Sequence, residues 1–256
     1  MNKKLNPKNT LNKQTNHTAA NVNKRLLPML LGIVVVILVI VLVYITTGGN
    51  TSNSDVLEGL PNYTDVKGTI VVDGLKYEKQ PHLGSGDAKV KVIEFADFKC
   101  PACKKWTATY LDTFIKDYVD TGKVELYFMN FAFIDRDSYL AASAGEAIYQ
   151  QSNDKFWEYV HKLYANQGDE GKIWATQKFI LNFVKENING IDYAQFEQDL
   201  KNHTYMYDVK EDFKIAGAYG VNGTPKFMVN GTLLPDSTYE GLTAAIESSL
   251  SGTTVK

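Results

Sequence analysis

The stretch "VIEFADFKCPACKKW" at residues 92–106 holds both cysteines of this chain of 256 residues. Its first part is almost continuously apolar, which is typical of a central strand covered on both faces. Cys100 and Cys103 follow, separated by Pro101 and Ala102. Proline suits the first turn of a helix, where its missing N–H is not needed. The stretch therefore predicts a strand that turns directly into a helix, with a Cys-x-x-Cys pair at the junction.

The residues alone leave three interpretations of this pair: half of a metal site, two ordinary buried thiols, or a redox couple. Structural zinc needs four ligands, and the four histidines are scattered at positions 17, 82, 161 and 203. Ordinary buried thiols would not explain a position at a helix N-terminus. There, unpaired backbone N–H groups and the helix dipole favour a thiolate. The placement favours a redox couple, and no metal site is expected.

The two thiols are expected to differ. Cys100 begins the helix and is predicted to be the reactive thiolate. Cys103 lies one turn further in and is predicted to be the less exposed, resolving thiol. Three lysines beside the pair are expected to add positive charge from exposed positions: Lys99, Lys104 and Lys105.

A second motif, "GVNGTPKFMVNG" at residues 220–231, completes a resemblance. Together with the stretch around the cysteines it resembles the DsbA-like thiol-disulfide oxidoreductases of the thioredoxin superfamily. The resemblance is strongest to membrane-anchored Gram-positive members of the BdbD type and covers roughly residues 68–250. It implies an α/β thioredoxin fold with a helical insertion between its two halves, at about residues 138–219.

The resemblance also implies roles for single residues. Glu94 matches a buried acid near the second cysteine that helps to move its proton; the alternative is an ordinary exposed strand residue. Pro225 matches a cis-proline beside the sulfurs, and Thr224 would offer its backbone to a bound polypeptide; the alternative is a plain turn. Pro101 and Ala102 would also contact substrate. Many members carry histidine where this chain has Ala102, which leaves the redox poise open.

Hydrophobic periodicity predicts the remaining elements. We expect strands at 88–96 and 123–131, a helix from Pro101 to about Asp120 that Gly122 follows, and helices through the insertion. Asp73-Gly74 and Asn230-Gly231 each predict a hairpin turn. A capping box is expected at the last helix. Its residues and its buried face are Ser237 and Glu240, and Leu242, Ile246 and Leu250.

The N-terminal residues predict a membrane anchor. Residues 26–45 form an uncharged apolar run of helical length sufficient to span a bilayer, after a basic tail at 1–25. The tail is expected to be disordered and cytoplasmic, and 46–67 to be an extracytoplasmic linker before a domain at 68–256. A cleaved signal peptide is the alternative. Without the six basic residues of the tail, 21 basic residues face 29 acidic ones, which argues against a nucleic-acid partner.

These observations predict a membrane-tethered oxidase that introduces disulfides into exported proteins on the extracytoplasmic face. The mechanism needs no bound cofactor. The resemblance implies a quinone-linked membrane thiol oxidase as the partner that reoxidises the pair. Two alternatives stay open: a disulfide reductase or isomerase on the same fold, and a non-enzymatic module that binds Cu(I) through the two thiols.

Overall fold

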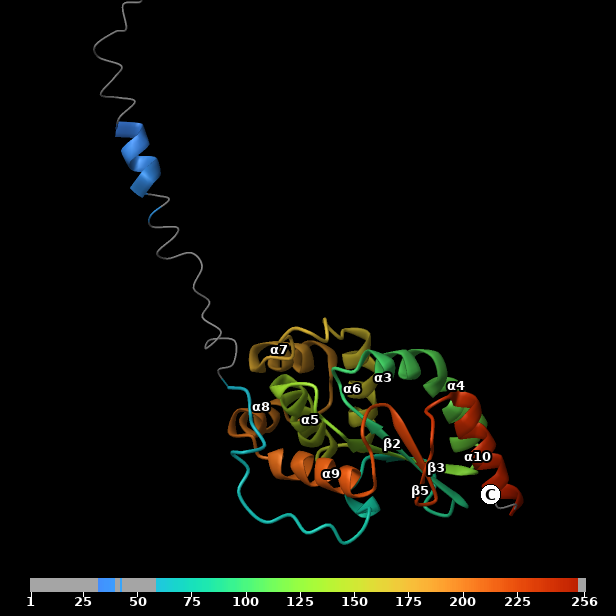
Figure 1. The fold of residues 1–256 in the computed structure, drawn as a ribbon. Helices are drawn as coiled ribbons and strands as arrows, with labels where there is room; N and C mark the ends of the chain where they lie inside the picture. The colour runs from blue at the N-terminus through green and yellow to red at the C-terminus, as the bar shows by residue number, and fades with distance from the viewer. Residues whose placement is uncertain (1–31, 40–41, 43–58, 253–256) are drawn as a thin grey trace, which may run out of the picture. The chain divides into compact units, whose positions relative to one another are not determined.

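The computed structural model describes residues 32–39, 42 and 59–252 (Figure 1). The expected tail, most of the expected anchor and residues 46–58 of the expected linker lie outside these residues. Residues 32–39 are helical with exposed side chains. Within the described ranges, no helix has the length and apolar character to cross a membrane.

A mixed five-stranded sheet organises the body formed by residues 59–252, in the order β1-β3-β2-β4-β5. The central strand β2 pairs in parallel with β3 and antiparallel with β4. The two edge strands are short and antiparallel to their neighbours. The strands are β1 (His82–Leu83), β2 (Val90–Ala96), β3 (Val124–Asn130), β4 (Lys226–Val229) and β5 (Thr232–Leu233).

Strand β2 is buried on both faces, as its apolar character predicts. Val90 and Val92 belong to the larger hydrophobic core, whereas Ile93 and Phe95 belong to a second core on the opposite face. Alternate side chains of a strand point to opposite sides of a sheet, so a strand covered on both sides has no polar face. Helix α9 (Met206–Ala218) contributes to the second core, and α10 (Tyr239–Ser251) to the first.

The helix after the cysteines begins at Pro101, as predicted. Its segments are α3 (Pro101–Trp106), α4 (Asp112–Phe114) and two π-helical turns, Thr107–Leu111 and Ile115–Val119. Gly122 follows with a φ of 71°, a backbone conformation that glycine adopts readily. The sequence pattern did not reveal the π turns, because a few wide turns shift an apolar face only slightly. The predicted aromatic face is confirmed: Trp106, Tyr110, Phe114 and Tyr118 all contact the larger core.

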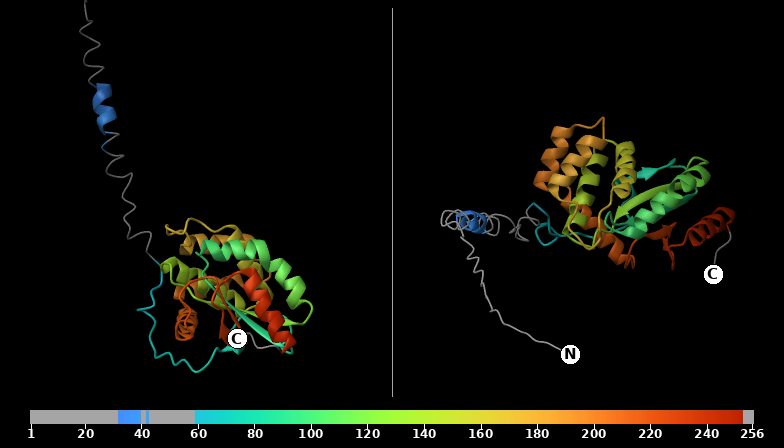
Figure 2. Two further views of the ribbon diagram at one scale, coloured as in Figure 1. Left: turned by 45° about the vertical axis from the view of Figure 1, so that its right-hand side comes forward. Right: turned by 90° about the horizontal axis from the view of Figure 1, so that it is seen from above.

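Five helices form the insertion, which begins at Arg136 and ends at Ala218. In the right-hand view of Figure 2, α10 lies apart from these helices, toward the other end of the sheet. The five helices confirm a helical block between the two halves of the sheet. Besides α9, the helices are α5 (Arg136–Tyr149), α6 (Asn153–Ala165), α7 (Gln177–Asn187) and α8 (Tyr193–Asn202).

The predicted hairpin at Asp73-Gly74 is wrong. Residues 69–76 form no strand, and the chain enters a short 3₁₀ turn at Tyr77–Lys79. Val71 is 64% exposed, because the β-branched run finds no neighbouring strand with which to pair. By contrast, the hairpin at Asn230-Gly231 is confirmed, and both of its turn residues have positive φ angles.

The packed body begins before the boundary expected at residue 68. Leu60 is buried, and the Tyr63 ring stacks on Tyr139 with centroids 4.0 Å apart. The Tyr63 hydroxyl donates to the carbonyl of Ala132 at 3.0 Å. These contacts attach the segment around Leu60 and Tyr63 to the body. The hydrophobic pattern of this segment did not predict them.

The last helix is capped one residue later than predicted. Thr238 is the N-cap, and its side chain accepts a hydrogen bond from the backbone N–H of Gly241. The Ser237 hydroxyl instead donates to the carbonyl of Pro225. Leu242 and Ile246 are fully buried as expected, whereas Leu250 is only partly buried.

Candidate active site

Both cysteines lie where β2 ends and α3 begins. Cys100 is the N-cap of α3, with an extended backbone that turns out of the sheet, and Cys103 lies one turn along the helix. Cys100 is 6% exposed and Cys103 is fully buried, and both are free thiols. Pro101 and Ala102 between them are exposed. The expected difference in exposure between the two thiols is therefore present, although both are more enclosed than a surface motif would be.

The loop before β4 brings Thr224 and Pro225 to the cysteines. The Thr224–Pro225 peptide bond is cis, as expected. The Cys100 Sγ donates to the Thr224 carbonyl oxygen at 3.2 Å. The Thr224 hydroxyl is also buried. Because β4 pairs directly with β2, this loop and the end of β2 are neighbours at one edge of the sheet. The alternative of a plain turn is excluded by this contact.

The surroundings of Cys100 favour its thiolate and lower its pKa to about 6. The largest contribution is a hydrogen bond from the Cys103 thiol, and burial opposes it. The Thr224 hydroxyl and the backbone N–H groups of Cys103 and Ala102 add to the lowering. These N–H groups are the unpaired donors of the first helical turn. At neutral pH, Cys100 is therefore mostly a thiolate.

Cys103 and Glu94 form the buried half of the site. Burial, together with the negative charge of Cys100, raises the pKa of the Cys103 thiol well above its usual value. Glu94 lies in β2 and is 1% exposed, so the alternative of an exposed strand residue is excluded. Burial, with a smaller contribution from Cys100, raises the pKa of the Glu94 carboxyl to about 8. Its Oε1 has no partner among the described residues, so the group can hold or release a proton beside the pair.

The expectation that Lys99 contributes an exposed charge is wrong. Lys99 is fully buried, and its Nζ lies 2.7 Å from Asp137 Oδ1 and 3.0 Å from the carbonyl oxygen of Lys172. Asp137 Oδ2 in turn accepts the backbone N–H groups of Trp174 and Ala175. A lysine survives full burial only when it is paired and hydrogen-bonded in this way. Its charge is therefore neutralised inside the fold.

Asp97 is a site residue that sequence reasoning missed. It is 1% exposed. Its Oδ1 accepts the N–H of Lys99 at 2.8 Å, and its Oδ2 accepts those of Phe133 and Ile134 at 2.9 and 3.1 Å. The carboxylate thus joins the turn after β2 to the loop after β3. The only feature of the sequence that could have indicated Asp97 is its position three residues before Cys100.

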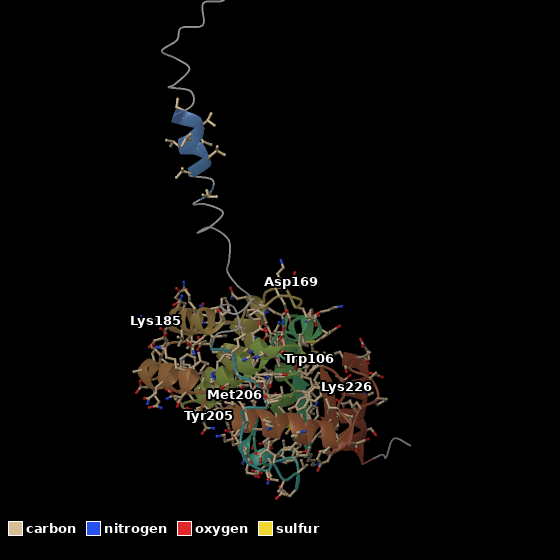
Figure 3. All side chains as sticks on the ribbon, turned by 60° about the vertical axis from the view of Figure 1, so that its left-hand side comes forward. Trp106, Asp169, Lys185, Tyr205, Met206 and Lys226 are labelled. Atoms are coloured by element: carbon tan, nitrogen blue, oxygen red, sulfur yellow. The ribbon has the colours of Figure 1, made fainter. Side chains whose placement is uncertain are left out.

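Aromatic packing supports the helix that carries the pair. The Trp106 ring, labelled in Figure 3, contacts the ring of Phe227 in β4 with centroids 5.0 Å apart. Phe98 contacts Phe128, Tyr159 and Tyr164 at 5.3 to 5.4 Å. The site is thus held between the sheet and α6. Among the described residues, no three His, Cys, Asp or Glu side chains are grouped as metal ligands.

Comparison with known proteins shows the family to which the chain belongs. The model of the family described as Thioredoxin matches residues 76–248. The chain belongs to the thioredoxin family. It is 45% identical over 175 residues to the probable disulfide bond formation protein D of Bacillus anthracis, covering 68% of this chain and 80% of that protein. The disulfide bond formation protein D of Bacillus subtilis is 31% identical over 174 residues, covering 68% and 78%.

Solved structures of thioredoxin-family members agree with the fold. Oxidised BdbD from Bacillus subtilis superposes with a TM-score of 0.65 at 30% identity, covering 72% of this chain and 100% of that one. DsbA from Chlamydia trachomatis has a TM-score of 0.64 at 22% identity, covering 74% and 100%, and shows the likeness of fold alone. The chain is thus a DsbA-like oxidoreductase of thioredoxin fold, similar to the Bacillus disulfide formation proteins.

Proposed function

We propose that this protein introduces disulfide bonds into other proteins through the Cys100–Cys103 pair. The observation that carries the proposal is the opposite tuning of two adjacent thiols. The pKa of Cys100 falls to about 6, whereas that of Cys103 is raised well above its usual value. A stabilised thiolate is a good leaving group, so a disulfide that contains it oxidises other thiols readily. The names of the similar Bacillus proteins support the same direction.

The reaction proceeds by two thiol-disulfide exchanges. A substrate thiolate attacks Cys100 Sγ of the oxidised pair, the Cys100–Cys103 bond breaks, and Cys103 leaves with the electron pair. A second substrate thiolate then attacks the substrate sulfur of the mixed disulfide, and Cys100 leaves as a thiolate. The substrate loses two electrons and two protons. The protein gains both electrons and keeps one proton on Cys103, and the other proton goes to solvent.

Glu94 is the group we assign to the proton of Cys103. When Cys103 leaves as a thiolate in a fully buried position, its negative charge is costly there. Glu94 is buried with it, and its pKa of about 8 keeps its carboxyl mostly protonated at neutral pH. A carboxylic acid in this state can pass its proton to the sulfur. In the reverse direction it accepts the proton when the pair is reoxidised.

The substrate chain is bound beside the cis-proline loop. The backbone of Thr224 lies against Cys100, where a polypeptide can add to it as an extended strand. Pro101 and Ala102 are exposed next to it and offer a small apolar contact. Backbone recognition together with small apolar contacts suits many different substrate sequences, which an oxidase of unfolded proteins requires.

The cellular setting is part of the proposal. The apolar run at 26–45 after a basic tail supports a membrane anchor that places residues 46–256 on the extracytoplasmic face. Disulfides persist in such oxidising spaces. Each turnover leaves a dithiol, so a membrane thiol oxidase linked to quinone is the proposed electron acceptor.

The test uses the oxidised full-length chain and a reduced, unfolded protein with two cysteines. We expect disulfides to appear in the substrate, and Cys100→Ser and Cys103→Ser each to abolish them, because neither variant can form the Cys100–Cys103 disulfide. An unchanged rate with Cys100→Ser would refute the proposal. A copper titration in the same experiment addresses the alternative of a copper-binding module, which predicts tight stoichiometric binding.

A reductase or isomerase is the second candidate, and Ala102 favours it. Many relatives of this type carry histidine at this position, and its absence removes one source of thiolate stabilisation. A glutathione titration separates the two candidates. A potential near about −120 mV supports the oxidase, and one near about −270 mV supports the reductase.

A further inference from the structure

The turn that presents Cys100 is held from the helical insertion. Three of its carbonyl oxygens accept hydrogen bonds from side chains at the end of α6. Tyr164 Oη donates to the carbonyl of Asp97 at 3.2 Å. Gln167 Nε2 donates to the carbonyls of Phe98 and Cys100 at 2.8 and 3.0 Å. The side-chain amide nitrogen of Gln167 thus links Phe98 to Cys100, the two ends of the segment that leads into α3.

Gln167 is itself fixed in place. Its backbone N–H donates to the carbonyl of Tyr164 at 3.2 Å. The next residue is Gly168, where an added Cβ would lie 2.6 Å from Cγ of Trp174, so the loop is closely packed against that ring. The same loop is tied down again where Lys99 reaches the carbonyl of Lys172. The amide therefore approaches the turn from a defined position. Asp169, labelled in Figure 3, belongs to this loop and is exposed.

The two bonds of Gln167 act on the electrostatics around the Cys100 sulfur. A peptide carbonyl oxygen carries partial negative charge, which disfavours a nearby thiolate when it is not paired. Gln167 pairs the carbonyl of Phe98 and gives the carbonyl of Cys100 a second donor beside the backbone N–H of Lys104, without adding a net charge. It also orients the peptide unit at the N-cap of α3, from which the N–H groups of the first turn point toward the sulfur.

We propose that Gln167 is a positioning residue that holds the Cys100 turn in the shape that favours the thiolate, so that the helical insertion sets the oxidising strength of the pair. The inference rests on the proposed function, in which Cys100 is the sulfur that a substrate thiolate attacks and that then leaves as a thiolate. It gives the insertion a role in the redox chemistry, in addition to any contact that it makes with substrate.

Two variants of the full-length chain test this. Gln167→Met keeps the length of the side chain and removes both donors, and Gln167→Glu replaces them with acceptors. Asn166→Met and Asn166→Asp are the matched controls, because Asn166 is an exposed neighbour whose amide donates only to its own helix, at the carbonyl of Lys162. The readouts are the pH dependence of iodoacetamide alkylation, the equilibrium with glutathione, and the unfolding midpoints of both redox forms.

At pH values below the Cys100 pKa, we expect Gln167→Met to lower the fraction of Cys100 present as thiolate by about threefold. We expect Gln167→Glu to lower it by about tenfold. At pH values well above the Cys100 pKa, the glutathione equilibrium should move toward the disulfide by the same factors, and the Asn166 variants should match the wild type. A merely structural clamp would instead lower both unfolding midpoints equally and leave alkylation and equilibrium unchanged, which overturns the inference. If Cys100 of the wild type titrates like free cysteine, the proposed function itself fails.

Discussion

The Cys100 sulfur lies 3.2 Å from the Thr224 carbonyl oxygen, to which the protonated thiol donates, although 124 residues separate the two positions in the chain. The paired strands β2 and β4 create this proximity, since Cys100 follows the end of β2 and Thr224 precedes the start of β4, and these two ends are neighbours in the antiparallel pair. The contact joins the reactive thiol to the segment that we assign to substrate binding. It also places the Thr224 hydroxyl beside the sulfur, where it helps to stabilise the thiolate.

Removing this hydroxyl should weaken the thiolate. Thr224→Val keeps the side-chain shape and the backbone carbonyl but deletes the donor that helps to lower the Cys100 pKa. We expect that pKa to rise by about 0.5–1 unit, as measured by iodoacetamide alkylation against pH. Thr232→Val in β5, an exposed position, is the control and should leave the pKa unchanged. An equal effect of both variants would contradict the assigned contact.

The potential of the pair should depend on pH in two regimes. Below pH 6 both cysteines of the reduced form carry protons, so reduction takes up two protons and the potential should fall by about 59 mV per pH unit. Above pH 6 only Cys103 takes up a proton, and the slope should halve to about 30 mV. Glutathione titrations between pH 5 and pH 7.5, roughly the window around this pKa, measure it. A single slope throughout would show that Cys100 is not a stabilised thiolate.

Glu94→Gln should change both stability and rate. The native pKa of Glu94, about 8, lies above its unfolded value, so its stabilising contribution is complete below about pH 4 and is lost as the pH rises to 8. The amide does not titrate. The variant should therefore gain about 1–3 kcal/mol relative to the wild type between pH 4 and pH 8 in denaturant unfolding. Substrate oxidation should slow, because the proton donor to Cys103 is gone.

Glu125→Gln is a control that should change the stability in the opposite direction. Glu125 lies in β3 opposite Lys91, and although burial opposes the shift, hydrogen bonds from Tyr127 and Lys91 lower its pKa. Its stabilising contribution is present above the unfolded pKa and is lost as the pH falls through the native one. This variant should therefore lose stability relative to the wild type at neutral pH. Parallel pH profiles for the two variants would contradict the assignment of Glu94.

Breaking the buried ion pair should be costly. Lys99 and Asp137 are both fully buried, so Asp137→Asn leaves an unpaired lysine charge inside the fold, and we expect a loss of about 3–5 kcal/mol in unfolding free energy. The double variant Lys99→Met with Asp137→Asn should recover much of it, because no charge is left unpaired and the amide oxygen can still accept the N–H groups of Trp174 and Ala175. The partly exposed pair of Lys155 and Glu158 is the comparison, with an expected cost below about 1 kcal/mol. Equal losses at both pairs would show that burial is not the reason.

The sequence by itself determined the parts of the protein that depend on local pattern. The strand-helix junction, the aromatic face of the helix after Pro101 and the hairpin at Asn230-Gly231 follow from side-chain periodicity and turn chemistry within short segments. The two motifs, together with their resemblance to a known family, also identified both cysteines, Glu94 and the cis-proline. These features need no knowledge of what packs against them.

Only the tertiary structure decided which residues support the pair. From its sequence, Lys99 is expected to be a surface charge, and only the fold shows that Asp137 lies beside it. In the same way, no sequence pattern marks Gln167, and only the fold brings its side chain to the turn before Cys100. The failed hairpin near Asp73 has the same cause, since a strand exists only where a partner pairs with it. Burial and hydrogen bonding between distant segments arise from packing, and no local pattern records them.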